Sequence, residues 1–215
     1  KIIFVSTLSL HIDSSVEAHE EGLCMTRDVN GEKFCHVLFA EAAFKGIKGV
    51  DYQKALSYLK KNCEEKSPDP QTKGRHLDTY HSLGYVSTSL QKSSVSRHIE
   101  YVYYDFCISK LAKMLGDDSA AVRFAGYSQR IWNLWRDDKK SFWPRNADST
   151  WVEDKKVNIT KTIPDSWNDK YCYESPIDIW SLHALQDIPE LIRRMGGNEV
   201  FVQYLDNKFK EGMTV

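Results

Sequence analysis

The sequence predicts an all-α fold, in which helical hairpins are connected by long loops that gather at one end. Apolar residues recur at spacings of three and four in several segments, which is the pattern of amphipathic helices. Gly and Asp stand between these segments, where helices commonly end and begin. Strand-like patterning is limited to residues 2–10, and no strict internal period indicates a repeat protein.

The composition is that of a folded protein and excludes several classes of function. Of 215 residues, 41% are hydrophobic and 12% aromatic, and the net charge is −1. This balance provides no general attraction to nucleic acid or to an anionic membrane surface. The longest apolar runs, such as 37–40, are far shorter than the roughly 20 residues of a membrane-spanning helix. We therefore expect no nucleic-acid partner and no membrane span.

The first helices are predicted at 35–47 and after Asp51. Asp51 suits the N-cap of the second helix, and residues 67–74 read as a loop rich in Pro, Asp, Lys and Gly. Residues 80–94 read as irregular. The apolar positions that define the two helices are Leu38, Phe39, Ala42, Ala43, Ala55, Leu56 and Leu59.

The strongest helical pattern runs from about residue 94 to 115, with Ser94 or Ser96 as its cap. Beside its apolar stripe lies a second one that is polar and aromatic. Tyrosines beside Arg and carboxylates suggest a face that lines a wet cavity, and the alternative is a half-buried packing face with an Arg–Glu pair. The second stripe consists of Arg97, Glu100, Tyr101, Tyr104 and Asp105.

The second half of the chain continues the helical pattern. Gly116 and Asp117 predict a tight turn into a helix that reaches Trp135 and packs antiparallel to the preceding one. Residues 137–171 form a long, tryptophan-rich loop region, which in a folded domain is usually functional. A final pair of helices is predicted at 178–195 and 198–210, with Pro189 either kinking the first or starting a new helix.

Cysteine usage and one short motif bear on the cellular compartment. The chain has five Cys and no Cys-x-x-Cys spacing, which disfavours a zinc knuckle or a thioredoxin-type site. Cys24 and Cys35 flank a turn-like Asn-Gly and are candidates for a disulfide, while the alternative is five buried thiols. Asn158 begins an Asn-Ile-Thr acceptor pattern for N-glycosylation. We expect a secreted or lumenal protein with Asn158 as a glycosylation site.

Phosphate-binding, dinucleotide-binding, zinc-protease and serine-hydrolase motifs do not occur in the sequence. What remains is carboxylates beside aromatic rings, the mixture that glycoside hydrolysis needs. A carboxylic acid protonates the leaving oxygen, a carboxylate activates water, and flat rings cover the apolar face of the sugar. The candidate segments are residues 97–105, the tryptophan-rich loop and residues 171–174.

Residues 95–108 resemble a signature of glycoside hydrolase family 92, whose members are α-mannosidases that mostly act on α-1,2-linked mannose. The chain reads Val-Ser-Arg-His-Ile-Glu-Tyr-Val-Tyr-Tyr-Asp-Phe-Cys-Ile where the family has Val-Ser-Arg-Thr-Leu-Glu-Tyr-Ala-Tyr-Asp-Asp-Trp-Cys-Ile. Residues 40–49, 142–153 and 192–206 resemble further family segments in the same order. The resemblance extends over about residues 20–211.

The resemblance implies a fold and a mechanism. Family members carry an (α/α)6 barrel of six helical hairpins, invert the anomeric centre and depend on calcium. We therefore expect residues 34–215 to form part of such a barrel and residues 1–33 to form an extended segment. Glu174 falls at the position of the family's general acid, and a mannose-containing glycan is the expected substrate. The residues expected to bind substrate are Arg97, Glu100, Tyr101, Asp105, Arg145 and Asp187.

Departures from the family pattern leave a second interpretation open. Ser175 and Pro176 replace the family's Gly-Asn after the acid, and of its Pro-His-Asp only Asp187 is kept. The Gly-Asn-Asp-Asp motif that includes the general base does not occur before Val215. We therefore expect the base and most calcium ligands outside this chain, which would be weakly active or inactive alone. The alternative is a catalytically dead structural subunit or glycan-binding module, and in either case a further chain or an oligomer is expected to cover exposed helix faces.

Overall fold

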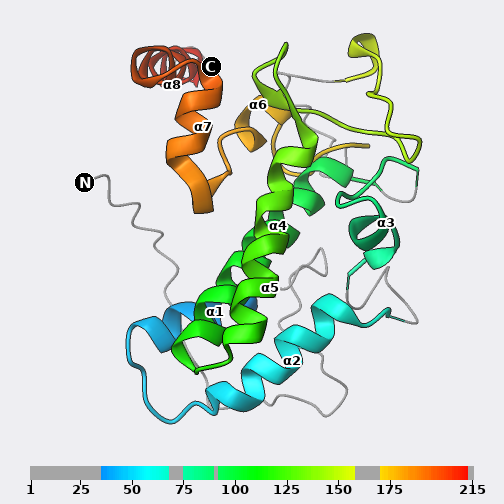
Figure 1. Cartoon of the computed structure of the whole chain (residues 1–215). Helices are drawn as coiled ribbons and strands as arrows, with labels where there is room; N and C mark the ends of the chain where they lie inside the picture. Colours follow the sequence, from blue (N-terminus) through cyan, green and yellow to red (C-terminus); the bar gives the residue numbers. More distant parts are fainter. Residues whose placement is uncertain (1–34, 68–74, 90–91, 158–169, 213–215) are drawn as a thin grey trace.

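The computed structural model of the chain describes residues 35–67, 75–89, 92–157 and 170–212. The fold of these residues is all-α, as predicted, with a single two-stranded hairpin (Figure 1). The predictions for residues 2–10, for Cys24 and for Asn158 lie outside the described residues, as does most of the loop at 67–74. The helices are α1 (Cys35–Phe44), α2 (Tyr52–Glu64), α3 (Leu77–Ser82), α4 (Ser94–Met114), α5 (Asp118–Ser128), α6 (Ile177–Trp180), α7 (Ile188–Met195) and α8 (Asn198–Gly212).

The helices α4 and α5 run side by side through the middle of the molecule (Figure 1). Gly116, with φ of +81°, ends α4, and the Asp117 carboxylate accepts a hydrogen bond from the backbone N–H of Ala120 at 3.0 Å. So short a turn leaves the two helices antiparallel, as predicted. α1 and α2 lie at one end of this pair, and α7 and α8 lie at the other (Figure 1).

Two predicted caps have different outcomes. Asp51 caps α2 as predicted, because its carboxylate accepts a hydrogen bond from the Lys54 N–H at 2.9 Å. The cap predicted for α4 at Ser94 or Ser96 is wrong. The capping position is Ser93, which has φ of +60° and makes no side-chain capping bond. Carbonyl oxygens from residues 170 and 171 take over that role.

Most differences from the predicted boundaries occur in the second half of the chain. The helix expected to reach Trp135 ends at Ser128 and continues as the 3-10 helix η1 (Gln129–Leu134). The predicted long loop begins with the strands β1 (Trp135–Arg136) and β2 (Ser141–Phe142), which pair antiparallel, and later contains η2 (Asp154–Lys156). The helix predicted at 178–195 is divided into α6, η3 (Leu185–Asp187) and α7. α7 begins beside Pro189, because a residue without an N–H is tolerated in the first turn of a helix and not in its interior.

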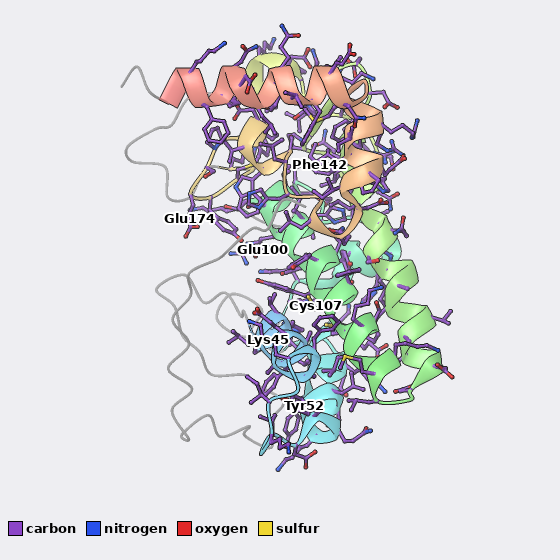
Figure 2. The ribbon with its side chains drawn as sticks, turned by 90° about the vertical axis from the view of Figure 1, so that its left-hand side faces the viewer. Lys45, Tyr52, Glu100, Cys107, Phe142 and Glu174 are labelled. Atoms are coloured by element: carbon purple, nitrogen blue, oxygen red, sulfur yellow. The ribbon has the colours of Figure 1, made fainter. Side chains whose placement is uncertain are left out.

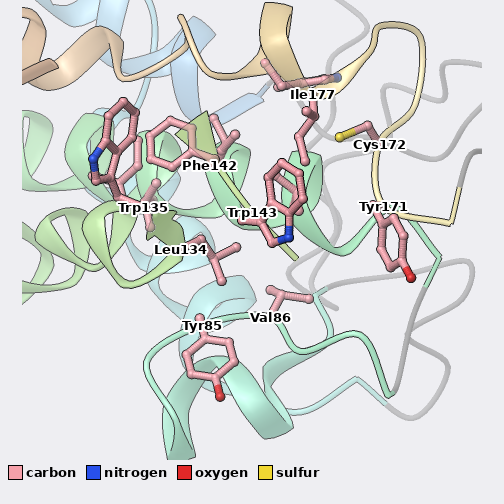
Figure 3. Packing of buried hydrophobic residues seen from close by; sticks show 14 of the residues in the cluster. Tyr85, Val86, Leu134, Trp135, Phe142, Trp143, Tyr171, Cys172 and Ile177 are labelled. Carbon is pink, nitrogen blue, oxygen red and sulfur yellow. The ribbon is translucent and has the colours of Figure 1, made fainter. Parts of the chain in front are cut away.

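Two hydrophobic clusters hold the fold together. The first packs α1, α2 and α5 against the C-terminal half of α4, around Leu56, Ile108 and Phe124. The second surrounds the N-terminal half of α4 and includes Trp143 and Phe142 (Figure 3). α4 therefore contributes to both clusters, its N-terminal half to one and its C-terminal half to the other. Large apolar side chains remain exposed on α1, α5 and α8, namely Phe44, Val122 and Phe209.

Candidate active site

Glu174 lies at the centre of a three-residue turn. The Ser175 N–H donates a hydrogen bond to the Tyr173 carbonyl at 2.6 Å, which closes a γ-turn across Glu174. The backbone of Glu174 has φ of +61°, a left-handed conformation that costs a non-glycine residue about 1–3 kcal/mol. The side chain of Glu174 is exposed, whereas Tyr171, Cys172 and Tyr173 are buried. The turn therefore exposes the Glu174 carboxylate to solvent, while the residues that precede it are buried.

The segment before Glu174 is attached to the first turn of α4. The Ser93 N–H donates to the Lys170 carbonyl, and the Val95 N–H donates to the Tyr171 carbonyl, each at 2.8 Å. The first N–H groups of a helix have no partner within the helix, so an adjoining strand of backbone can satisfy them. These bonds bring residues 170–174 together with the beginning of the family-like signature, more than 70 positions earlier in the chain.

Arg97 and Glu100 lie in the first turns of α4 and are half-buried. Figure 2 shows Glu100 on the same side of the molecule as Glu174. Arg97 Nε donates to the Lys92 carbonyl at 3.3 Å, and the Arg97 charge acts together with burial to lower the pKa of His76 to about 4. Arg97, Glu100 and the Glu174 turn thus gather around the N-terminal end of α4.

Deeper along α4, Tyr101 and Asp105 are buried under Arg75. Arg75 Nη1 and Asp105 Oδ1 form an ion pair of 2.8 Å, in which both side chains are almost fully buried. Tyr80 donates a short hydrogen bond from its hydroxyl to the other Asp105 oxygen, and the Arg75 guanidinium lies 4.9 Å from the Tyr101 ring centre. Tyr101, Tyr104 and Asp105 are therefore buried in this structure.

Arg145 is placed on a different loop. Its guanidinium lies between the rings of Tyr85 and Trp151, at 5.0 and 4.9 Å, and donates to the carbonyls of Ser149 and Asn133. These contacts fix the turn at residues 145–151, and among the described residues they do not extend to Glu174.

Asp187 is the last residue of η3, directly before α7, and is half-buried. Its backbone has φ of −148°, its N–H donates to the Ala184 carbonyl at 2.9 Å, and its side chain makes no capping bond to α7. The structure thus places Arg97 and Glu100 in the first turns of α4, to whose beginning residues 170 and 171 are hydrogen-bonded. It buries Tyr101 and Asp105 and places Arg145 and Asp187 elsewhere. Their expected roles toward substrate remain predictions.

Two residues of this region were not anticipated from the sequence. Arg75 gives no sequence signal, because an Arg at the end of a polar loop is usually solvated. Trp180 packs edge-on against Tyr173, with the ring centres 5.2 Å apart, and donates from its indole nitrogen to the Tyr173 carbonyl at 2.8 Å. A Trp six positions after a candidate acid is the signal that identifies it in retrospect.

The family resemblance implies a calcium ion, for which the described carboxylates are candidate ligands. Calcium takes six to eight oxygen ligands, usually including carboxylates. Within the ranges that the structure describes, no group of three or more His, Cys, Asp or Glu side chains is arranged to hold a metal. The same ranges contain no helix long and apolar enough to span a membrane.

Comparison with known proteins shows which family this chain resembles. The family model described as "Glycosyl hydrolase family 92 catalytic domain" matches residues 14–214. An uncharacterized secreted glycosidase of Arthroderma benhamiae is 29% identical over 195 residues, which is 79% of this chain and 25% of that protein.

Solved structures of this family are also similar to the chain. A family GH92 inverting mannosidase of Bacteroides thetaiotaomicron superimposes with a TM-score of 0.70 and 25% identity, over 80% of this chain and 22% of that one. A GH92 α-mannosidase of the same organism, in complex with mannoimidazole, superimposes with a TM-score of 0.69 and 25% identity, over 81% and 22%. The chain spans about a quarter of the length of these relatives. The sequence signature, the helical fold and the family match together establish that the chain belongs to glycoside hydrolase family 92.

Proposed function

We propose that this chain is part of the catalytic domain of an inverting α-mannosidase that cleaves α-1,2-linked mannose, with Glu174 as the general acid. The observation that carries the proposal is the exposed Glu174 carboxylate on a turn of left-handed backbone, attached to the start of α4. A general acid must reach the glycosidic oxygen and must be held in one orientation. Strained backbone conformations of this kind cluster at functional sites.

An inverting reaction needs a second carboxylate, about 6.5–9.5 Å from the acid, to activate the attacking water. We assign this base, and the calcium ligands, to polypeptide outside the present chain. The proposal is supported by the length of the relatives, of which the chain spans about a quarter. Exposed Phe44, Val122 and Phe209 support a further chain or domain against the outer helix faces.

A catalytically inactive glycan-binding module is the second candidate. Ser175 and Pro176, which replace the Gly-Asn of the family pattern, favour it, because they directly follow the proposed acid. For both candidates a secreted or lumenal location is proposed, supported by the relative that is named as secreted and by the acceptor pattern at Asn158.

The test is release of mannose from α-1,2-mannobiose, with and without added calcium, by a protein that contains this chain together with the polypeptide proposed to supply the base. Glu174→Gln should lower the rate by about 10²–10⁴-fold, because the amide cannot donate the proton. Glu199→Gln, at an exposed position on α8, is the matched control and should leave the rate unchanged. Equal activity of Glu174→Gln and the parent would refute the acid assignment. Mannobiose binding without mannose release would favour the glycan-binding module.

A further inference from the structure

The indole of Trp180 donates a hydrogen bond to the turn that carries Glu174. The Tyr173 carbonyl accepts two hydrogen bonds, one from the Ser175 N–H at 2.6 Å and one from Trp180 Nε1 at 2.8 Å. The first bond closes the γ-turn around Glu174. The second fixes the same oxygen, and hence the orientation of the peptide plane that precedes Glu174.

Trp180 is itself held rigidly. Its side chain is 7% exposed, and its ring packs edge-on against Tyr173 and tilted against His183, whose ring centre lies 4.8 Å away. The residue that follows, Ser181, accepts a hydrogen bond at its hydroxyl from the Phe142 N–H at 3.0 Å. The C-terminal end of α6 is therefore joined to strand β2.

The other side of α6 is fixed by the C-terminal helix. Lys208 Nζ and Asp178 Oδ2 form a mostly buried ion pair of 2.7 Å. The Tyr204 hydroxyl donates to the Asp178 carbonyl at 3.1 Å. α6 has only four residues and little stability of its own, so these contacts from α8 and β2 make it a firm support for the Trp180 indole.

We infer that Trp180 is a positioning residue, which holds Glu174 in its left-handed conformation by fixing the Tyr173 carbonyl. The cost of that conformation must be offset by the surrounding structure, and the indole hydrogen bond acts directly on the turn. The catalytic consequence rests on the proposed function of Glu174, whereas the conformational consequence does not depend on it.

The conformational part is tested by comparing Gly with Ala at position 174. Both substitutions remove the carboxylate, but only Gly adopts positive φ without strain. In the parent chain, Glu174→Gly should give a folding equilibrium constant about three- to tenfold larger than that of Glu174→Ala, as measured by urea denaturation. In the Trp180→Phe background the turn is free to relax, and the advantage of Gly should disappear or reverse.

Trp143→Phe is the matched control. Trp143 is also buried and also donates its indole hydrogen to a backbone carbonyl, that of Val152 at 2.9 Å, but it does not bond to the Glu174 turn. In this background the Gly advantage should persist. If Trp180→Phe preserves the advantage as fully as Trp143→Phe does, the inference is wrong.

A second measurement applies if Trp180→Phe does not fold. Glu174→Pro, at an exposed position, forces φ to about −65° and thereby removes the left-handed turn. NMR should show faster hydrogen exchange of the Trp180 indole N–H in this variant and no change at Trp143. Unchanged exchange at Trp180 would overturn the inference.

The effect of Trp180 on catalysis is measured separately, through kcat and KM. Where the parent releases mannose, Trp180→Phe should lower kcat and leave KM unchanged relative to Trp143→Phe. Inactivity of the protein that also contains the polypeptide proposed to supply the base would count against the proposed function, while the Gly and Ala comparison would still decide the inference about Trp180.

Discussion

Arg75 and Asp105 form a buried ion pair of 2.8 Å, although 30 positions separate them in the sequence. The Asp105 side chain has no exposed surface, and the Arg75 side chain is 3% exposed. The pair joins the segment before α3 to the middle of α4. The rings of Tyr101 and Tyr104 and the hydroxyl of Tyr80 contact the pair, so it is part of the buried packing of α4.

Asp105→Asn should lower the free energy of unfolding by about 3–5 kcal/mol, because it leaves the Arg75 guanidinium buried without an opposing charge. Urea denaturation measures the change. Glu41→Gln is the control, because it removes an exposed ion pair with Lys45 and should cost less than about 1 kcal/mol. Similar losses of unfolding free energy in the two variants would show that burial does not determine how much the Arg75–Asp105 pair contributes to stability.

Stability should fall in acid partly because of His98. Burial lowers the pKa of His98 from 6.5 to about 4, so the unfolded chain takes up a proton at higher pH than the folded chain does. The contribution of neutral His98 to the free energy of unfolding is fully present above pH 6.5. It is lost progressively as the pH falls from 6.5 to about 4. Between pH 7 and pH 5 the loss should be about 2 kcal/mol.

His98→Gln removes this titration and should flatten the pH dependence over the same interval. The amide N–H of Gln can still donate to the Arg130 carbonyl, which His98 Nε2 contacts at 2.9 Å. Denaturation curves at pH 5 and pH 7 for both proteins measure the difference. An identical pH dependence of the parent and the variant would contradict the assignment to His98.

Asp117 should stabilise the fold more through its hydrogen bond at the start of α5 than through its charge. Its carboxylate accepts from the Ala120 N–H at 3.0 Å and pairs with Lys60 at 2.8 Å. Asp117→Ala removes both contacts and should cost about 1–2 kcal/mol, whereas Asp117→Asn keeps the cap and should cost less than about 1 kcal/mol. Thermal or urea denaturation distinguishes the two, and equal losses would show that the charge dominates.

Gly84 should tolerate substitution less well than Gly116. Both have positive φ, +76° and +81°, but a Cβ at Gly84 would lie 2.7 Å from Asn133 Nδ2, whereas one at Gly116 would meet nothing within 4 Å. The same amide donates to the Gly84 carbonyl at 2.9 Å, so it cannot move away without breaking that bond. Gly116→Ala should cost about 1 kcal/mol of backbone strain, and Gly84→Ala should cost more. A smaller loss at Gly84 would contradict the steric argument.

The elements with local signals were predicted well. The helix at 94–115 and the turn at Gly116 and Asp117 depend on periodicity, on a left-handed glycine and on an Asp cap, all of which act within a few residues. The start of α7 beside Pro189 is likewise a local signal, because it depends on the missing N–H of one residue. The N-terminal cap of α4 was mispredicted because the carbonyls that satisfy it come from residues 170 and 171, which local sequence does not connect to Ser93.

The amino-acid sequence by itself determined the all-α class, the course of the central helix, and the family through its signature at 95–108. It also singled out Glu174 as the candidate acid. Only the tertiary structure decided which polar residues of α4 are buried, that Arg75 neutralises Asp105, and that Trp180 braces the turn at Glu174. The reason is physical: helix periodicity and caps arise between neighbours in the chain, whereas burial and long-range hydrogen bonds depend on which segments meet in space.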